Sequence, residues 1–382
     1  MSRPMTVVTV TTAVQRRGAP TDTGTTFLVF ASSTGGPSVP TVCFSKDDAT
    51  TAGVPSPFAD YVADALTQGA PKVVVLKAAA VTPASVTEAE WTAALNKLTV
   101  EYGPGQVIIP GVTGTPVQNA LLAHAAAFSR AVIIDAASTA TASSLTTLAA
   151  SIAASPGAQF AALVTGWVNF AAVGGGTRQT PGSVIAAGLA ARGDAVAGHA
   201  NNAPMVDQGR GIGVVTRGLS TSVAYTSAEL DSLNDGGVTV IRDVLRADST
   251  GALVAVPTLY GWVSVSSSAS YKQFNYGRFV MELAYTLGAQ MEAFIGRQID
   301  GRGRLFAEVS GALTGILLPY YAANALFGST SSAAFAVDVA GATTPANIVA
   351  GFINANVEVS LSPHTEKVTV NVLTNVAQGV AA

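Results

Sequence analysis

The sequence contains few charged residues. It has 20 lysines and arginines and 23 aspartates and glutamates among 382 residues, or 11%, whereas a typical globular domain has about 25%. The net charge is −3 and neither sign forms a run, so the basic stripe of a nucleic-acid-binding protein is missing. Hydrophobic residues make up 49% and the mean hydropathy is +0.41. These values are typical of a membrane protein, or of a protein whose surface is largely covered by other chains.

Long uninterrupted hydrophobic runs are also missing. The most apolar stretch, 311–328, contains Gly311, Gly315, Pro319 and Asn324. It is shorter than the roughly 20 apolar residues that a membrane-spanning helix needs. The first residues of the chain lack the basic region and the leucine-rich stretch of a signal peptide. We therefore expect no direct membrane insertion, and the composition favours a surface covered by other protein.

Cysteine and histidine are rare. The single cysteine, Cys43, excludes an intramolecular disulfide and fits a protein made in a reducing cytoplasm. Its apolar neighbours predict a small core residue rather than a nucleophile. None of the three histidines, His124, His199 and His364, lies three to five residues from another histidine or from the cysteine. The usual zinc spacings are therefore absent, and we predict no metal and no cofactor.

Signatures of nucleotide-binding and catalytic sites are missing as well. The chain has no G-x-x-x-x-G-K-[ST] loop and no G-x-S-x-G elbow. Its glycine-rich stretch 174–180 predicts a flexible turn rather than a phosphate site. We therefore expect that the protein is not an enzyme. An α/β enzyme that binds a nucleotide stays open as an alternative, because the order of strands and helices would also suit one.

A regular alternation of strands and helices is present from about residue 57 to 170. Short runs of β-branched residues predict buried strands, and apolar residues at i, i+3 and i+4 predict helices. The expected strands are 72–78, 106–111, 130–136 and 159–168, and the expected helices are 57–69, 87–98, 115–129 and 142–155. This alternation predicts a parallel sheet covered by helices.

The rest of the sequence mixes helices and strands in another order. Helix start and stop signals mark 181–198 and 226–237, and an amphipathic stretch spans about 270–296. Alternating apolar residues then predict strands at 333–341 and 354–362. The expected fold class is therefore α/β and α+β, with a parallel α/β sheet domain followed by a C-terminal α+β core domain.

Strand-like sequence also occupies both ends of the chain as extended β-strand arms. The apolar arm residues are Val7, Val8, Val10 and Val14 at the N-terminus and Val368, Val370 and Val372 at the C-terminus. Because a terminal strand needs a partner, we predict a hairpin of 354–362 with 365–375 and addition of the arms to sheets of neighbouring subunits. The predicted division is an arm at 1–24, an α/β domain at 25–258 (outer part about 57–170), an α+β core at 259–364 and a C-terminal strand and arm at 365–382.

Residues 181–242 carry a specific combination of motifs. A proline-started helix ends in Ala-Arg-x-Asp, a glycine and an Ala-Pro follow, and a later segment reads Leu-Asn-x-x-Gly-Val-Thr-x-Ile-Arg. These residues are Pro181, Ala191, Arg192, Asp194, Gly198, Ala203, Pro204, Leu233, Asn234, Gly237, Val238 and Arg242. The combination resembles the contractile phage tail sheath family, which includes the sheaths of phage-tail-like contractile injection systems.

Other segments are similar to this family in the same order, along nearly the whole chain. Residues 18–37 resemble its N-terminal strand, and 106–111 and 130–136 occupy the places of its Pro-Gly and Leu-Asp pairs. Residues 347–372 resemble its C-terminal core, in which a glutamate, here Glu366, opens the final strand.

The resemblance implies a structural, force-producing protein. Sheath subunits stack as hexameric rings in a helix around an inner tail tube, and terminal arms tie them together. On a trigger the sheath shortens and widens and drives the tube through a target envelope, as in genome ejection by a bacteriophage, without consuming a nucleotide. The implied partners are further copies of the chain, the inner tube protein, and baseplate and tail terminator proteins, with no nucleic acid.

The implied location is the tail of a virion assembled in the host bacterial cytoplasm, or a contractile injection particle. Another tail or baseplate protein stays open as an alternative. Three arginines in a glycine-rich stretch, Arg297, Arg302 and Arg304, have no interleaved aromatic residues. We expect them to form inter-subunit salt bridges or tube contacts rather than to bind nucleic acid.

Overall fold

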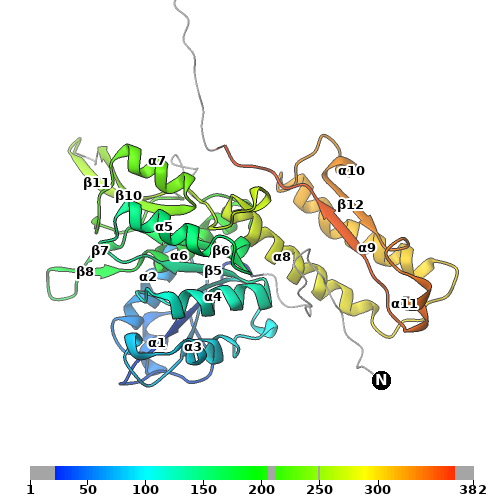
Figure 1. The fold of residues 1–382 in the computed structure, drawn as a ribbon, viewed down its shortest axis with the longest axis horizontal. Helices are drawn as coiled ribbons and strands as arrows, with labels where there is room; N and C mark the ends of the chain where they lie inside the picture. Colours follow the sequence, from blue (N-terminus) through cyan, green and yellow to red (C-terminus); the bar gives the residue numbers. More distant parts are fainter. Residues whose placement is uncertain (1–21, 205–211, 248–249, 366–382) are drawn as a thin grey trace, which may run out of the picture.

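A mostly parallel eight-stranded sheet organises the chain up to Tyr260 (Figure 1). The computed structural model describes residues 22–204, 212–247 and 250–365. The strand order is β11-β10-β6-β5-β4-β1-β3-β2. The strands are β1 (Thr26–Phe30), β2 (Thr41–Cys43), β3 (Val73–Lys77), β4 (Gln106–Ile108), β5 (Ala131–Asp135), β6 (Ala161–Thr165), β10 (Val238–Ala247) and β11 (Leu253–Tyr260). The inner six strands are parallel and only the two edge strands pair antiparallel, which confirms the predicted parallel sheet.

Helices cover both faces of this sheet. Successive residues of β1 alternate between two cores, since Leu28 and Phe30 lie in one and Phe27 and Val29 in the other. The first core is closed by α1 (Lys46–Thr51), α2 (Phe58–Gln68) and α6 (Gly182–Ala197), and the second by α3 (Glu88–Leu95), α4 (Thr115–Phe128), α5 (Ala142–Ile152) and α7 (Ser227–Asp235). Because both faces are buried, the strands read as continuous apolar runs. Cys43 is fully buried in the first core, as predicted.

The helix ends follow local sequence signals. The capping boxes of α3 and α7 are both formed: Glu90 accepts from the Thr87 backbone and Glu229 from the Thr226 backbone, each at 2.8 Å. Single turns of 3-10 helix connect other elements. They are η1 (Pro83–Ser85), η2 (Val100–Tyr102), η3 (Ala158–Phe160), η4 (Ala269–Tyr271) and η5 (Glu292–Phe294).

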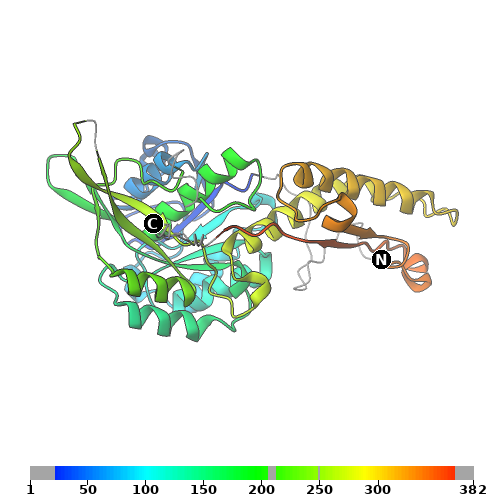
Figure 2. The same cartoon turned by 90° about the horizontal axis from the view of Figure 1, so that it is seen from above.

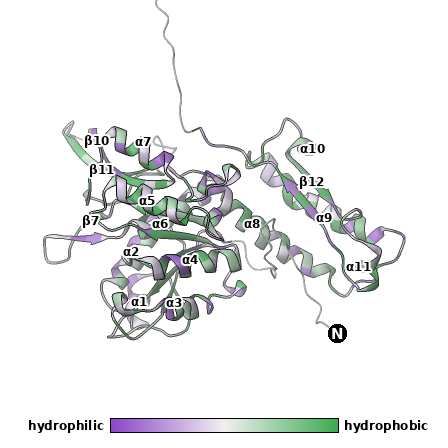
Figure 3. Ribbon diagram, viewed as in Figure 1, coloured by the Kyte–Doolittle hydropathy of each residue, from purple (hydrophilic) through white to green (hydrophobic). Residues whose placement is uncertain are grey.

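A small three-stranded sheet lies beside the main one. It consists of β7 (Val168–Ala171), β8 (Thr177–Thr180) and β9 (Ser220–Thr221) in the order β8-β7-β9. The predicted glycine turn is the tip of the β7–β8 hairpin, where Gly174, Gly175 and Gly176 all have positive φ. Figure 3 shows β8 in purple because its residues are hydrophilic. The hairpin itself was not predicted, because its strands are short and only partly buried.

The remaining chain projects from the sheet as a C-terminal unit, residues 274–365 (Figure 2). It contains α8 (Phe274–Met291), α9 (Arg304–Ala322), α10 (Ser331–Ala334), β12 (Phe335–Asp338), α11 (Pro345–Val349) and β13 (Asn356–Val359). The helix α8 belongs to both parts. Its Met281 and Tyr285 lie in a core of the main sheet, whereas Leu283 and Leu287 lie in the separate core of the C-terminal unit.

The apolar stretch 311–328 lies mostly within α9, a helix that the sequence analysis did not predict. By length and composition, α9 is the one helix among the described residues that could cross a membrane. One such helix is weak evidence of a membrane span, and 22% of its apolar window is buried within the chain. The apolar side of α9 here packs in the core of the C-terminal unit through Leu305, Val309, Leu313 and Leu317. The break at Pro319 falls in its last turn.

The C-terminal unit contains a strand pair that was not predicted, and the predicted hairpin of 354–362 with 365–375 stays a prediction. β13 pairs antiparallel with β12, Ala336 opposite Glu358, whereas the predicted partner 365–375 lies almost entirely outside the described residues. All arm residues from Val7 to Val14 and from Glu366 to Val372 lie outside them too. The predicted division at 258 falls inside β11, and the domain boundaries stay a prediction.

Two helical glycines provide a test of this packing. A Cβ on Gly277 in α8 would lie 2.0 Å from the Gln159 carbonyl oxygen, whereas nothing lies within 4 Å of a Cβ on Gly315 in α9. We expect Gly277→Ala to lower the free energy of unfolding by about 1–3 kcal/mol through overpacking. Gly315→Ala should raise it by about 0.5–1 kcal/mol, since alanine favours a helix. Urea unfolding of both purified variants measures this, and equal signs would contradict the packing described.

Candidate functional site

A buried ion pair joins the sheet domain to the C-terminal unit. Arg278 on α8 is fully buried, and its guanidinium donates to both carboxylate oxygens of Asp194 on α6, at 3.0 Å and 2.5 Å. Thr23 Oγ1 and Asn202 Nδ2 each donate to the same carboxylate at 2.7 Å. A bidentate, charge-assisted pair with further donors is the arrangement that can offset the cost of burying two charges. The motif residue Asp194 therefore ties four segments together.

A buried carboxyl group lies one turn further along α8. Glu282 accepts from the backbone N–H of Ala200 at 2.7 Å and from the Tyr320 hydroxyl of α9 at 3.0 Å. Burial raises the pKa of Glu282 to about 7, and the Asp194 carboxylate acts in the same direction. The two hydrogen bonds and Arg278 oppose the rise. Glu282 thus connects the loop after α6 to α9 and titrates near neutrality.

The loop after α6 also holds the end of α9. Asn201 Nδ2 donates to the Ala325 carbonyl at 2.6 Å, and its Oδ1 accepts from Asn275 at 2.5 Å. The His199 ring lies 3.3 Å from the Ala323 carbonyl. Arg278, Glu282 and Asn201 together form a polar junction, and the sequence analysis missed all three. A signal existed for two of them, because Arg278 and Glu282 lie four residues apart as the two charged residues of a largely apolar helix, where charged side chains need partners.

The motif residues of α6 act within the chain. Pro181 is the N-cap of α6. Arg192 donates to the Val214 carbonyl at 2.9 Å and to Thr216 Oγ1 at 2.8 Å, which fixes the segment that passes beside α6. Pro204 lies close to Gly193 of the same helix. These residues hold α6 and its neighbours in place.

The later motif residues also hold the fold. Leu233 is fully buried on α7, and Gly237 turns the chain into β10 with φ of +82°. Asn234 lies against Gly261, where an added Cβ would be 2.2 Å from its Oδ1. The Arg242 guanidinium stacks 4.3 Å from the centre of the Tyr260 ring across the β10–β11 pair. The structure does not bring the two groups of motif residues together in one site.

A third buried carboxyl group lies at the end of β5. Asp135 accepts from the Ser183 backbone at 2.7 Å, from the Ser183 hydroxyl at 2.6 Å and from the Gly111 backbone at 2.9 Å. Burial raises the pKa of Asp135 to about 6 against the effect of these bonds. It caps the start of α6, so it is positioned for structure rather than for chemistry.

The three predicted contact arginines lie on the loop between α8 and α9 and at the start of α9. Arg297 forms an ion pair with Glu308 and stacks on the Phe294 ring at 5.4 Å. Arg302 and Arg304 are exposed and form no ion pair with a described residue. Their inter-subunit role stays a prediction.

The pair of strands β12 and β13 has free edges within the described chain. These two strands hydrogen-bond with each other and with no further strand there. Ser360 N–H donates to the Ala334 carbonyl at 2.8 Å, so this side of the extended segment faces β12. By alternation along the strand, the backbone groups of Val357 and Val359 point to the other side. A two-stranded sheet is marginal alone, and such an edge is a template for another strand.

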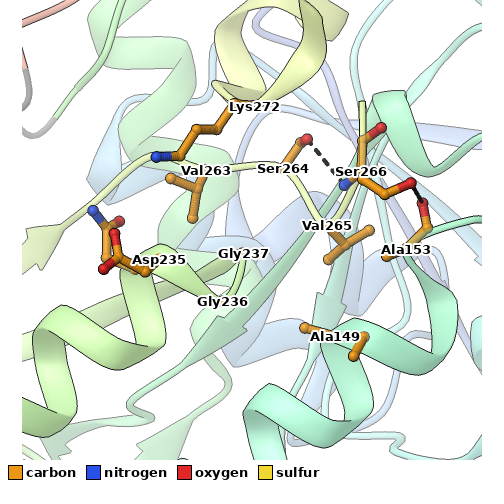
Figure 4. Close-up of a pocket in the computed structure, with 13 residues that line it drawn as sticks. Ala149, Ala153, Asp235, Gly236, Gly237, Val263, Ser264, Val265, Ser266 and Lys272 are labelled. Atoms are coloured by element: carbon orange, nitrogen blue, oxygen red, sulfur yellow. Dashed lines mark hydrogen bonds between the residues drawn. The ribbon is translucent and has the colours of Figure 1, made fainter. Parts of the chain in front are cut away.

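One surface hollow among the described residues is lined mainly by alanine, glycine and serine. It lies between the ends of α5 and α7 and the segment 263–267, and Asp235 and Lys272 supply its charges (Figure 4). The hydroxyl of Ser264 is bound to the Tyr271 carbonyl, and that of Ser267 to the Ala153 carbonyl. Among the described residues no three His, Cys, Asp or Glu side chains could hold a metal ion.

Solved structures share this fold. A chain of the anti-feeding prophage baseplate matches with a TM-score of 0.70 and 18% identity, over 98% of this chain and 97% of that one. A chain of the contracted sheath of the extracellular contractile injection system PVC matches with 0.68 and 14%, over 97% and 94%. A sheath tail protein from Listeria innocua matches with 0.58 and 10%, over 84% and 89%. At these identities the similarity shows a shared fold. At the level of the fold, it confirms the resemblance to contractile sheath proteins.

No protein-family model matches the chain, and no curated protein does.

The polar junction predicts a pH-dependent stability. The pKa of Glu282 is about 7 in the folded chain, against an ordinary value of 4.5. Between these values the folded state holds a proton that the unfolded state has lost, so stability falls as the pH rises and levels off above about 7. Glu282→Gln cannot titrate. From pH 5 to 8, the free energy of unfolding of the wild type should therefore fall by about 1–3 kcal/mol relative to that of Glu282→Gln.

Denaturant unfolding at several pH values measures this difference. Asp135 titrates in both proteins, so its contribution cancels. Glu282→Ala is the matched control. It cannot titrate either, but it loses the bonds to Ala200 and Tyr320 at every pH, so it separates the loss of these bonds from the loss of the titrating group. A difference between wild type and Glu282→Gln that stays flat across this range would contradict the assignment.

Proposed function

We propose that this chain is a structural sheath subunit of a contractile tail or of a contractile injection particle. The observation that carries the proposal is a fold shared over nearly the full length with a sheath chain and a baseplate chain of such particles. A fold alone leaves function open. Here the likeness agrees with the low charge density of the sequence and with the free strand edges of β12 and β13.

In the proposed assembly, subunits form stacked six-fold rings around an inner tube. The solved baseplate relative is six-fold symmetrised, and a head-to-tail contact that does not close generates a helix of subunits. The terminal arms, with Val7, Val8, Val10 and Val14 at one end and Glu366, Val368, Val370 and Val372 at the other, would add to the free edges of β12 and β13 in neighbouring copies. Main-chain hydrogen bonds would supply the affinity.

Exposed apolar side chains of the C-terminal unit support a covered surface. Val349 is 91% exposed, Phe327 63% and Phe352 52%. Val349 and Phe352 lie at α11, before β13 begins, whereas Phe327 bonds with Ser360 after β13 ends. Large exposed apolar side chains are candidates for contact with other chains. In the proposed particle, neighbouring copies and the inner tube cover this unit, and Arg297, Arg302 and Arg304 contribute polar contacts. Baseplate and tail terminator proteins would contact the ends of the sheath, and the particle would be a phage tail or an injection device.

Contraction would use energy stored in the assembly. An extended sheath held by its arms would shorten and widen after a trigger from the baseplate, and it would consume no nucleotide. We propose no enzymatic step. Enzymes with this kind of sheet bind nucleotides beyond the carboxyl ends of the strands, with polar groups that are free to contact the ligand. In this chain the Asp135 carboxylate at that end already accepts hydrogen bonds from Ser183 and Gly111.

A baseplate ring component is the second candidate. The relative with a TM-score of 0.70 is a chain of a baseplate. A sheath subunit forms long tubes, whereas a baseplate component forms single rings, so the two can be told apart.

Negative-stain microscopy of the purified full chain tests the proposal. We expect wide hollow tubes or stacked rings that grow with protein concentration. Single rings that never stack would favour the baseplate candidate. Dispersed globular particles at high concentration would overturn both.

The arms provide a sharper test. Deletion of residues 1–16 or 365–382 should abolish tubes while leaving a folded monomer. The double variant Val370→Pro/Asn371→Pro should do the same, because proline removes a backbone donor on either side of the strand. Val370→Thr/Asn371→Thr keeps both donors and strand propensity and should still form tubes. Normal tubes from the proline variant would contradict strand addition, with folding checked by circular dichroism.

A further inference from the structure

At the end of the described chain, side-chain amides add to backbone pairing and then replace it. Ser360 bonds with the backbones of Ala334 and Phe327, at 2.8 Å each, and the Ser362 N–H donates to the Ala325 carbonyl at 3.1 Å. At Ser362 the carbonyl also accepts from Asn201 Nδ2 at 3.2 Å. At His364 both backbone groups bind one side chain. Gln273 Nε2 donates to the His364 carbonyl at 3.0 Å, and Gln273 Oε1 accepts from the His364 N–H at 3.1 Å.

In this contact, a side chain forms the two hydrogen bonds that a backbone residue forms in a β-bridge. A backbone residue in an antiparallel pair exchanges one N–H and one carbonyl bond with its partner, and the Gln273 amide offers the same donor and acceptor. Such a pair holds the backbone of His364 in position and direction. A chain end without such bonds frays.

The two amides are themselves fixed. Gln273 is 8% exposed and is the N-cap residue of α8, and its backbone pairs with Val263 in an isolated bridge. Asn201 is 2% exposed and accepts from the fully buried Asn275. Asn201 belongs to the polar junction, and Gln273 directly precedes α8, the helix that carries Arg278. The clamp, defined as Gln273 and Asn201, is attached to the sheet domain and to the C-terminal unit at once.

Seventeen residues follow Thr365 in the sequence, from Glu366 to Ala382, and they include the predicted C-terminal arm. We infer that Gln273 and Asn201 are positioning residues for subunit assembly, which fix the point and direction in which the C-terminal arm leaves the polar junction. This inference rests on the proposed sheath function. A fixed root confines the arm to fewer directions, which raises its effective concentration at the neighbouring edge of β12 or β13.

The inference separates arm positioning from folding. Gln273→Ala removes the two hydrogen bonds to His364. Within the monomer these two bonds hold only the last described residues. We expect its urea midpoint to stay close to that of the wild type. The critical concentration for tube formation, measured by pelleting and microscopy, should rise at least about tenfold, which corresponds to about 1.4 kcal/mol. Gln273→Glu keeps the acceptor but loses the donor, and it should fall between the two.

A second variant leaves the clamp intact. Three glycines inserted after Thr365 keep every described bond but loosen the arm beyond the root. The insertion should raise the critical concentration in the same way, and combining it with Gln273→Ala should add little further. Three glycines inserted at the tip of the β7–β8 hairpin, between Gly174 and Gly175, are the matched control and should leave tube formation unchanged.

The outcomes distinguish the two proposals. Wild-type protein that forms neither tubes nor rings overturns the proposed function. Wild-type tubes together with an unchanged critical concentration in Gln273→Ala overturn the clamp. A third outcome also overturns the clamp: Gln273→Ala loses both tubes and much of its urea midpoint, while the glycine insertion forms normal tubes. Gln273 would then have a structural role alone.

Discussion

The Arg278–Asp194 ion pair is the constraint on which the arrangement of the two parts depends. It joins α8 to α6, and through Thr23 and Asn202 it also holds the start of the described chain and the loop after α6. Apolar packing is non-directional, whereas a bidentate pair has one geometry. Loss of one partner would leave a buried charge, at a cost of about 3–5 kcal/mol. The pair therefore sets the angle at which the C-terminal unit leaves the sheet.

Local sequence signals predicted much of the sheet domain. Strands such as 130–136 are buried on both faces and read as apolar runs, and the capping boxes at Thr87 and Thr226 need only residues three positions apart. The pairing of β13 with β12 was not predictable, because it depends on contacts about 20 residues apart along the chain and on packing against α9. The helix α9 escaped prediction because its glycines and Pro319 resemble breaks in an apolar run.

The candidate site was harder to predict than the fold. The motif around Arg192 and Asp194 pointed to the right region, but the partners of these residues lie far away along the chain. Arg278 is 84 positions from Asp194, and Thr23 is 171 positions from it. No periodicity pairs a helix residue with so distant a carboxylate. The motif residues hold the chain's own fold, whereas the arginines at 297, 302 and 304 lie exposed on the far unit, and their role depends on partners that one chain does not contain.

Under the proposed function, whole subunits move, and this movement needs a stiff connection between the unit that precedes the predicted C-terminal arm and the larger sheet domain. α8 supplies the rod, because it runs unbroken from one core into the other. Hydrogen bonds at Asp194, Glu282 and Asn201 stop that rod from rotating, since each fixes a direction as well as a distance. Under the proposed function, a pull on the C-terminal strand reaches His364 first, then Gln273 at the start of α8. Force on the arm would thus reach α8 at its N-terminal end, near the buried polar bonds, rather than at its exposed C-terminal end.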